Sequence, residues 1–457
     1  MSLTEPRQVR VTSCTLFSPG MTDKAPNGVS ILPFLQQVDI FESIFDNTIS
    51  ASVMILENVG LIELVPIVGA EFFWIAFEVD DEFGKPQKFE RQFRVTKIRD
   101  VSYPRQDFRL FTLDLSTHEF VTSVAHRISR QYAKKTVQEA VKDIITRDLD
   151  AGGRIKTLED TFGKVTITIP NYTPLQAINF FVLLAQTKKK KESNFVFFET
   201  LAGFHFTSIS KLIEDGKIAA KDTVFMINPG ATGKPLVEDG IMRNAIHRIY
   251  QDQTADLLVD IAGGMLRCQM IHFDFLARKL EHTEDSRYTE TFKKTTHLHE
   301  GNPVYPENYD QSLSKNVRTF TFPTNVWTNA GSWVKGIEPD APDQKLYESI
   351  VLHNRQLKEI THVQTLIEMP GHPEIRAGSV MNIQYPSTRY MSPDSLVTQS
   401  IPEVNTPLFT GPHLVTAVRH LFIPEGNGQF EYKMHLKVCK DSHRTKLTTF
   451  KKGETYE

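Results

Sequence analysis

Residues 45–77 carry more apolar strand sequence than one small sheet can bury, and this feature constrains the fold more than any other. In FDNTISASVMILE (residues 45–57) apolar and polar side chains alternate, which is the two-residue period of a half-buried strand. After a turn at Gly69, the segment EFFWIAF (residues 71–77) is apolar on both faces. Such a strand needs cover on both sides. The sequence therefore predicts a second layer, or a second subunit, against it.

Composition limits the classes of function open to the chain. Its 457 residues are enough for roughly two to four domains, and a formal net charge of -3 gives no electrostatic case for nucleic-acid binding. The chain has three widely separated cysteines, Cys14, Cys268 and Cys439, whose spacing fits neither a metal site nor a disulfide framework. This pattern is typical of a protein made in a reducing cytoplasm. The first residues lack a signal-peptide core, and no apolar run approaches the roughly 18 residues that span a bilayer. We expect no stable membrane association.

Local patterns predict strands, then a mixed segment, then strands again. Alternation indicates β structure as far as residue 116, with FRVTKIRDV and FRLFTLDLS paired as a hairpin. Two capping boxes follow, Thr136 with Glu139 and Thr173 with Gln176, and each precedes an apolar stripe at helical spacing. NFVFFET and FHFTSIS then form a predicted hairpin. The β pattern returns from residue 241, interrupted by a helical stripe in QKLYESIVLHNRQLKEI.

Several of these segments resemble one known family. GLIELVPIVGAEFFWIAF, EFVTSVAHRISRQY, PGHPEIRAGSVMNIQYPS and GPHLVTAVRHLF are similar to the central baseplate hub of contractile-tailed bacteriophages, whose fold is shared by the VgrG spike hub of type VI secretion. The resemblance covers roughly residues 40–120, 130–215, 240–285 and 345–442. One position departs from the pattern, because Ser379 stands where an acidic residue usually follows the glycine.

The resemblance implies an α+β fold, mainly β, with two tube-type antiparallel β-barrel domains flanking a small α/β domain. It also implies a homotrimer, whose six barrel domains would form a pseudo-sixfold ring. The domain limits that we predict are 1–116 for the first barrel domain, 117–235 for the α/β domain, 236–285 with 345–445 for the second barrel domain, 286–344 for an irregular insertion and 446–457 for a flexible tail.

The function implied is structural, in the tail baseplate of a virion assembled in the host bacterial cytoplasm. The ring would adapt a sixfold tail tube to a threefold spike. Expected partners are the trimeric tail spike protein, the tail tube or tube-initiator protein and neighbouring baseplate proteins, with DNA only in transit through the lumen. We predict a lumen that is not net basic, since a conduit should not retain its cargo. We predict no enzyme activity, no catalytic residue, no cofactor and no metal.

The alternative is a peptidoglycan hydrolase of the tail tip. A metal site at His297 and His299 with Glu300 lacks a third ligand at a recognisable spacing. The carboxylates of Glu63 and Glu71 are a possible pair for glycoside hydrolysis, but strand positions on a solvent face and at a strand start explain them equally.

Other candidates have weaker patterns. His353, His362 or His372 could serve a nucleophilic Ser379 with Glu374, but no nucleophile elbow surrounds that serine.

The Lys188–Lys191 run is expected at the end of the second helix, as a solvated positive terminus rather than a DNA or lipid site. GATGKP (residues 230–235) lacks phosphate-loop spacing. Trp327 and Trp333 leave open a saccharide-binding groove in the insertion.

Overall fold

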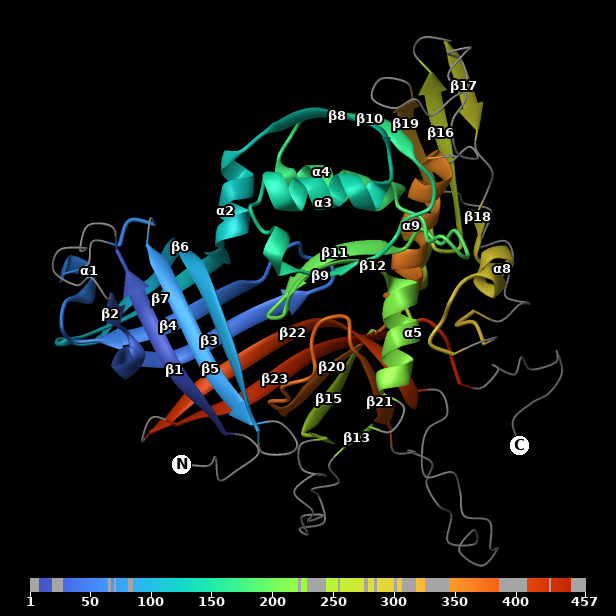
Figure 1. Cartoon of the computed structure of the whole chain (residues 1–457). Helices are drawn as coiled ribbons and strands as arrows, with labels where there is room; N and C mark the ends of the chain where they lie inside the picture. The colour runs from blue at the N-terminus through green and yellow to red at the C-terminus, as the bar shows by residue number, and fades with distance from the viewer. Residues whose placement is uncertain are drawn as a thin grey trace, which may run out of the picture.

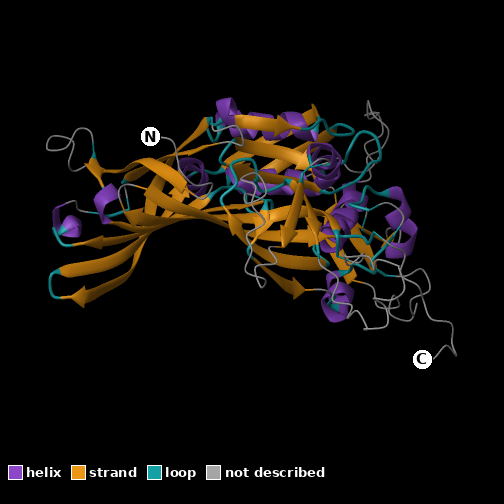
Figure 2. Cartoon of the chain, turned by 90° about the horizontal axis from the view of Figure 1, so that it is seen from below, coloured by secondary structure: helices purple, strands orange, loops and turns teal. Residues whose placement is uncertain are grey.

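Strands dominate the computed structural model, and the predicted class, α+β and mainly β, is confirmed. The structure describes residues 8–18, 28–64, 67–69, 71–80, 85–220, 223–227, 244–253, 255–274, 278–282, 286–299, 302–305, 318–324, 346–385, 409–426 and 429–444. Seen from below, strands run along most of the molecule, and most helices lie over one half of it (Figure 2).

A closed ring of antiparallel strands forms the first half of the molecule. Its members, in ring order, are β22 (Gly411–Gly426), β3 (Leu35–Ser43), β4 (Ser50–Glu57), β7 (Phe108–Thr117), β6 (Pro86–Arg105), β5 (Phe72–Asp80), β1 (Gln8–Phe17) and β23 (Gln429–Lys440). The pairing of β22 with β23 closes it. Closure gives each strand a partner on both sides over part of its length, and the inward side chains form one apolar core.

The alternation seen in the sequence sets which side chains enter that core. In β4, Ala51, Val53 and Ile55 are buried, and the residues between them are partly exposed. In β5 the second apolar face has its cover too. The ring of Phe72 lies against the Arg94 guanidinium, 3.4 Å from its centroid, and against His118 of helix α2 (His118–Ala125). Helix α2 therefore supplies part of the second layer that the sequence predicted.

A second ring shares β22 and β23 with the first. Its other members are β21 (Val380–Gln384), β13 (Val224–Ile227), β14 (Ala245–Ile246), β15 (Arg248–Gln253) and β20 (Val363–Pro370). Strand β13 is parallel to both of its neighbours. Between β14 and β15, the His247 amide donates to the Glu368 carbonyl of β20 at 2.9 Å, which closes the ring through the chain itself. In Figure 1 the shared strands lie between the blue strands of the first ring and strands β15 and β13 of the second.

The predicted domain limits stay a prediction, and three elements lie elsewhere than they imply. Strand β13 falls within the predicted α/β domain but pairs with β21 of the second ring. Strands β16 (Arg267–Asp274) and β17 (Lys279–His282) were expected in the second barrel. They instead form a separate sheet with β18 (Ser286–Arg287) and β19 (Arg318–Thr324) of the insertion. The parallel partner β19 was missed because the insertion shows little periodicity.

The α/β unit lies on one side of the rings with its own core (Figure 1). Its further elements are β8 (Ile128–Lys135), α3 (Val137–Arg147), β9 (Ile155–Leu158), β10 (Val165–Tyr172), α4 (Pro174–Leu184), β11 (Phe195–Thr200), β12 (Gly203–Ser208) and α5 (Ile209–Ala219). Both predicted capping boxes are confirmed at the starts of α3 and α4. The predicted helix α9 (Leu346–Ile360) is also present, and it packs on α4.

The Lys188–Lys191 run is placed differently from the prediction. Helix α4 ends at Leu184, so the lysines lie in the turn that follows. Lys188 pairs with Asp160 at 2.7 Å, and Lys191 lies over the Phe162 ring. None of the helices in the described part is long and apolar enough to cross a membrane.

Candidate functional site

One face of the sheet is hollowed across both rings. Eight strands form it in the order β15–β20–β23–β22–β3–β4–β7–β6, and every neighbouring pair is antiparallel. Two hollows, of about 570 and 450 Å³, lie side by side on it, and both are lined by Phe41 and Arg419. We call this surface the hollowed face. Tyr250, Leu366 and Phe41 leave 65%, 40% and 39% of their surface exposed there, which is unusual for large apolar side chains.

The charges of the hollowed face neutralise one another. Arg419 lies 2.9 Å from Asp39, and Arg99 lies 2.8 Å from Asp114. Two looser pairs join neighbouring strands: Arg248 with Glu368 at 3.9 Å, and Lys437 with Asp252 at 3.7 Å. Around the two hollows the basic residues number four, Arg99, Arg248, Arg419 and Lys437, against five acidic ones whose side chains are not buried in the joint below, Asp39, Asp46, Asp100, Asp114 and Glu368. The lining is therefore not net basic.

A buried carboxylate, Glu42, joins both rings to the α/β unit. It lies on β3 and accepts hydrogen bonds from the Leu201 amide at 2.8 Å and from the Ala377 amide at 3.1 Å. His420 of β22 is 3.6 Å away. Burial opposes ionisation, but His420, Arg376 and the Leu201 amide together lower the pKa of Glu42. The carboxylate thus stays charged and holds three parts of the chain at one point.

A second joint is a buried cluster of two arginines and two glutamates. Arg91 of β6 contacts Glu119 of α2 at 2.9 Å and Glu199 of β11 at 2.5 Å. Arg154 contacts the same two carboxylates, each at 2.7 Å. The other oxygen of Glu199 accepts from the Ile49 amide at 3.2 Å. Burial raises the pKa of Glu199 although both arginines oppose the change. The cluster fixes the α/β unit to the first ring.

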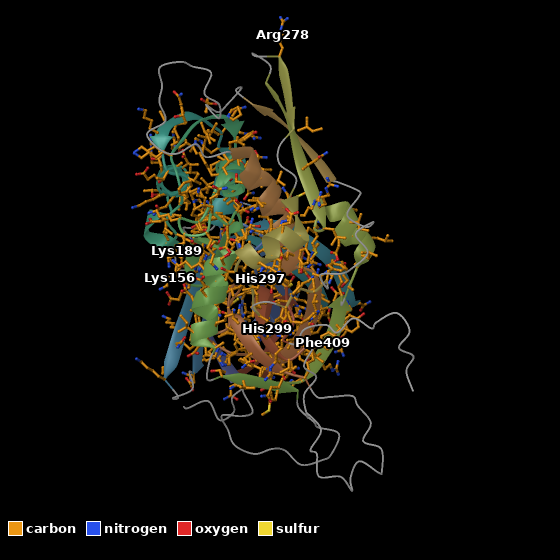
Figure 3. All side chains as sticks on the ribbon, turned by 90° about the vertical axis from the view of Figure 1, so that its right-hand side faces the viewer. Lys156, Lys189, Arg278, His297, His299 and Phe409 are labelled. Carbon is orange, nitrogen blue, oxygen red and sulfur yellow. The ribbon has the colours of Figure 1, made fainter. Side chains whose placement is uncertain are left out.

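The two histidines considered as metal ligands lie near each other in Figure 3 but have separate roles. His297 donates from Nδ1 to Asp441 at 2.9 Å and from Nε2 to the Phe292 carbonyl at 2.8 Å. Burial opposes protonation, but Asp441 raises the pKa of His297 above its usual value. Burial lowers the pKa of His299 to about 4. Glu300 lies outside the described residues, within which no three His, Cys, Asp or Glu side chains gather as metal ligands.

The histidines considered for a catalytic triad serve the packing around them. His353 donates from Nδ1 to the Ser193 carbonyl at 2.8 Å, and His362 lies 2.8 Å from Asp260. The Ser379 hydroxyl accepts from the Arg376 amide at 3.1 Å inside a turn.

In the preceding turn, Glu374 is exposed, and its backbone amide donates to His372 Nδ1 at 3.3 Å. These residues belong to separate backbone turns and helix contacts, and no triad geometry joins them to Ser379.

The carboxylate pair is separated as well. Glu63 was expected on a strand, but it lies on the short helix α1 (Leu61–Leu64), where Arg109 binds both of its oxygens. Glu71 was expected to begin a strand, and it lies immediately before the first residue of β5. Its side chain is fully buried and accepts hydrogen bonds from the Val68 and Gly69 amides at 2.7 and 2.8 Å. Both carboxylates are thus occupied by structural bonds. The candidates at 230–235, Trp327 and Trp333 lie outside the described residues.

Comparison with known proteins finds likeness in structure alone. No family model matches the sequence, and no curated protein matches it. Among solved structures, the 43 kDa tail protein of prophage MuSo2 from Shewanella oneidensis matches with a TM-score of 0.51 at 9% identity, over 94% of this chain and 99% of that one. The tail protein from Neisseria meningitidis MC58 matches with a TM-score of 0.50 at 8% identity, over 94% of this chain and 96% of that one.

This chain has the fold of these two tail proteins. The resemblance to a tail hub drawn from the sequence is therefore confirmed at the level of the fold. Sequence patterns did not find the hollowed face or the two buried joints. Their members, such as Arg91 and Glu199, come from distant segments and look locally like ordinary charged strand residues.

Proposed function

We propose that this protein is a structural subunit of the central baseplate hub of a contractile phage tail. In the proposal it acts as a homotrimer, and the hollowed face lines the channel. The observation that carries the proposal is that face: one antiparallel surface spans both rings, and its charges cancel within the chain. A duplex carries dense negative charge, so a lining whose cations are already paired would let it pass without holding it.

The size of such a channel supports the same reading. Three copies would place about 24 strands around an axis. At about 4.8 Å between strands the circumference is about 115 Å and the backbone diameter about 37 Å, and strand tilt widens it further. Side chains narrow this opening but leave a passage of the width that a nucleic acid duplex requires. Two rings per chain would also give six similar lobes in a trimer, which suits contact with a sixfold tube.

The proposal includes the partners that the resemblance to a tail hub implies. One end of the trimer would meet the tail tube or tube-initiator protein, and the other the trimeric spike, with neighbouring baseplate proteins around the outside. DNA would be present only in transit. The protein would be found in the tail baseplate of the virion after assembly in the bacterial cytoplasm.

Negative-stain imaging of the purified full chain, alone and with its spike partner, tests the proposal. We expect ring-shaped top views with threefold symmetry and six lobes. Particles of one subunit in both samples would overturn it. A peptidoglycan hydrolysis assay run on the same preparation separates the enzymatic alternative, and release of soluble fragments would favour a hydrolase.

A further inference from the structure

Three parts of the chain meet around one buried histidine, His297. It belongs to residues 292–299, which we call the clasp segment. From the α/β unit, Lys217 of α5 donates a hydrogen bond to the His297 carbonyl. From the second ring, Asp441 follows the last residue of β23 and accepts from the Leu298 amide at 3.1 Å. The clasp segment therefore connects the α/β unit to the end of the strand that both rings share.

The contacts of the His297 ring require both of its nitrogens to donate. Nδ1 lies 2.9 Å from the carboxylate of Asp441, and Nε2 lies 2.8 Å from the Phe292 carbonyl. A carboxylate and a carbonyl can only accept hydrogen bonds. The Thr295 hydroxyl, 2.7 Å from Nε2, has carbonyl acceptors of its own at Thr291 and Phe292, so it too can accept from the ring. Neutral imidazole has one N–H, and this arrangement needs two.

The acidic groups that face the ring favour its charged form. Asp441 is in contact with it, and Glu359 of α9 lies 3.8 Å from Nδ1. Glu359 also lies 3.7 Å from Arg355, one turn earlier on α9. The Phe292 ring stacks on the imidazole with 3.7 Å between their centroids, which suits a cation. Burial opposes protonation, but Asp441 and Glu359 together raise the pKa of His297.

Three basic groups complete the surroundings of the clasp segment. Lys217 binds the backbone of His297, as described above. Lys440 precedes Asp441 on β23 and donates to the carbonyls of residues 409 and 410 at 3.2 Å, and burial lowers its pKa to about 7. Burial lowers the pKa of His299 to about 4, so this second histidine stays neutral near neutral pH.

We propose that His297 is a protonation-dependent clasp, which fastens residues 292–299 to the end of β23 while its ring is charged and releases them when the ring loses a proton. After that loss, one ring nitrogen presents a lone pair to an oxygen less than 3 Å away, either of Asp441 or of the Phe292 carbonyl. The bonds beside it, from the Leu298 amide to Asp441 and from the His299 amide to the Ser442 hydroxyl, open with it. This inference does not depend on the proposed trimer.

The clasp has a defined direction with pH. Because the pKa of His297 is raised in the folded chain, the closed clasp holds the proton more tightly than the open one. Its stabilisation is complete below the ordinary histidine pKa of about 6.5 and is lost as the pH rises through the folded pKa. Within that window His297 raises the opening equilibrium by up to about tenfold per pH unit. An opening that also exposed Lys440 would add the opposite trend above about pH 7.

Hydrogen exchange at the carbon between the ring nitrogens of histidine, followed by mass spectrometry of the wild-type chain, gives the first test. The rate of this exchange follows the titration of each imidazole, so His297 and His299 are measured side by side without any substitution. We expect a midpoint above about 6.5 for His297 and one well below it for His299. A His297 midpoint at or below about 6.5 would overturn the clasp.

Amide exchange of wild type and His297→Gln gives the second test. Gln has no titrating group, and Lys440 is present in both proteins, so its contribution cancels in their ratio. For the Leu298 and His299 amides, we expect the wild-type protection factor, divided by that of the variant, to fall between about pH 6.5 and 8.5, by up to about tenfold per unit. A ratio that stays constant with pH would refute the proposal.

Two controls make the second test specific to the clasp. In His299→Gln, the same ratio should not change with pH, since His299 is neutral throughout this range. The amides of residues 51–55 in β4 lie within the first ring and should keep their protection factors at every pH. Loss of protection there together with the clasp segment would indicate unfolding of the whole chain and would overturn a local release.

Discussion

Two regions of the molecule consist of paired charges: the joint that connects the first ring to the α/β unit, and the hollowed face. The two regions differ in how far their charged side chains are exposed. In the joint, Glu199 is fully buried between Arg91 and Arg154. On the hollowed face, the Arg99 and Asp114 side chains leave 41% and 32% of their surface exposed. A buried pair that loses one member leaves a charge without solvent, and this costs several kcal/mol, whereas an exposed pair contributes about 0–1 kcal/mol. Similar ion pairs therefore hold the fold in one place and merely cancel charge in the other.

The largest effect is expected at the buried joint. Replacing Glu199 with Ala (E199A) leaves Arg91 and Arg154 to share the single carboxylate of Glu119 and takes the acceptor from the Ile49 amide, and should lower the free energy of unfolding by about 3–5 kcal/mol. The matched control is Asp114→Ala on the hollowed face, with an expected loss of about 0–1 kcal/mol. Denaturant unfolding measures both. Equal losses in the two variants would remove the distinction between joint and face.

Glu42 should show the next largest effect. In Glu42→Ala the Leu201 and Ala377 amides lose their acceptor while they remain buried, at a cost of about 2–4 kcal/mol in total. Glu42→Gln keeps one oxygen as an acceptor and should lose about half as much. Thermal unfolding of both variants measures the order. If Gln proved as damaging as Ala, the negative charge rather than the hydrogen bonds would hold the joint.

A smaller, pH-dependent effect is expected at His353. Burial lowers the pKa of His353 to about 4, so between about pH 6.5 and 4 the unfolded chain binds a proton that the folded chain does not. Stability therefore falls as the pH falls, by up to about 1.4 kcal/mol per pH unit from this residue. His353→Asn keeps a donor for the Ser193 carbonyl and should flatten the slope measured between pH 6.5 and 5. A slope equal to that of the wild type in the Asn variant would contradict the role given to His353.

The smallest effect is expected on the hollowed face itself. Lys437 is 3.7 Å from Asp252, and both side chains are well exposed. Lys437→Met should change the free energy of unfolding by less than about 0.5 kcal/mol and leave the oligomeric state as in the wild type. A loss of more than about 2 kcal/mol, by denaturant unfolding, would mean that the face carries stability as the joint does.

Local rules were enough to predict parts of the fold. The capping boxes at Thr136 and Thr173 set two helix starts within a few residues, and the alternation through Ala51, Val53 and Ile55 placed one strand face correctly. Lys188 was misplaced because helix α4 ends together with its apolar stripe at Leu184, four residues before the lysine.

Long-range pairings were beyond these rules. Val9 of β1 pairs with Phe430 of β23 at the far end of the chain, and no local signal marks that contact. The hollowed face follows from such pairings, as does the sharing of β22 and β23 between the rings. The buried charges could not be predicted for the same reason, since Glu199 looks like a solvent residue until Arg91 and Arg154 meet it.

The shared hairpin β22–β23 also determines when the fold can be completed during synthesis. Because it belongs to both rings, neither can close until about residue 440 has left the ribosome. At about 5–20 residues per second this is roughly 20–90 s after initiation. Throughout that time β1 lacks its partner β23 and β3 lacks its partner β22, and the apolar faces of both strands stay uncovered. The nascent chain should therefore depend on chaperones more than the stability of the folded protein suggests. A stop codon that removes β23 would prevent both rings from closing.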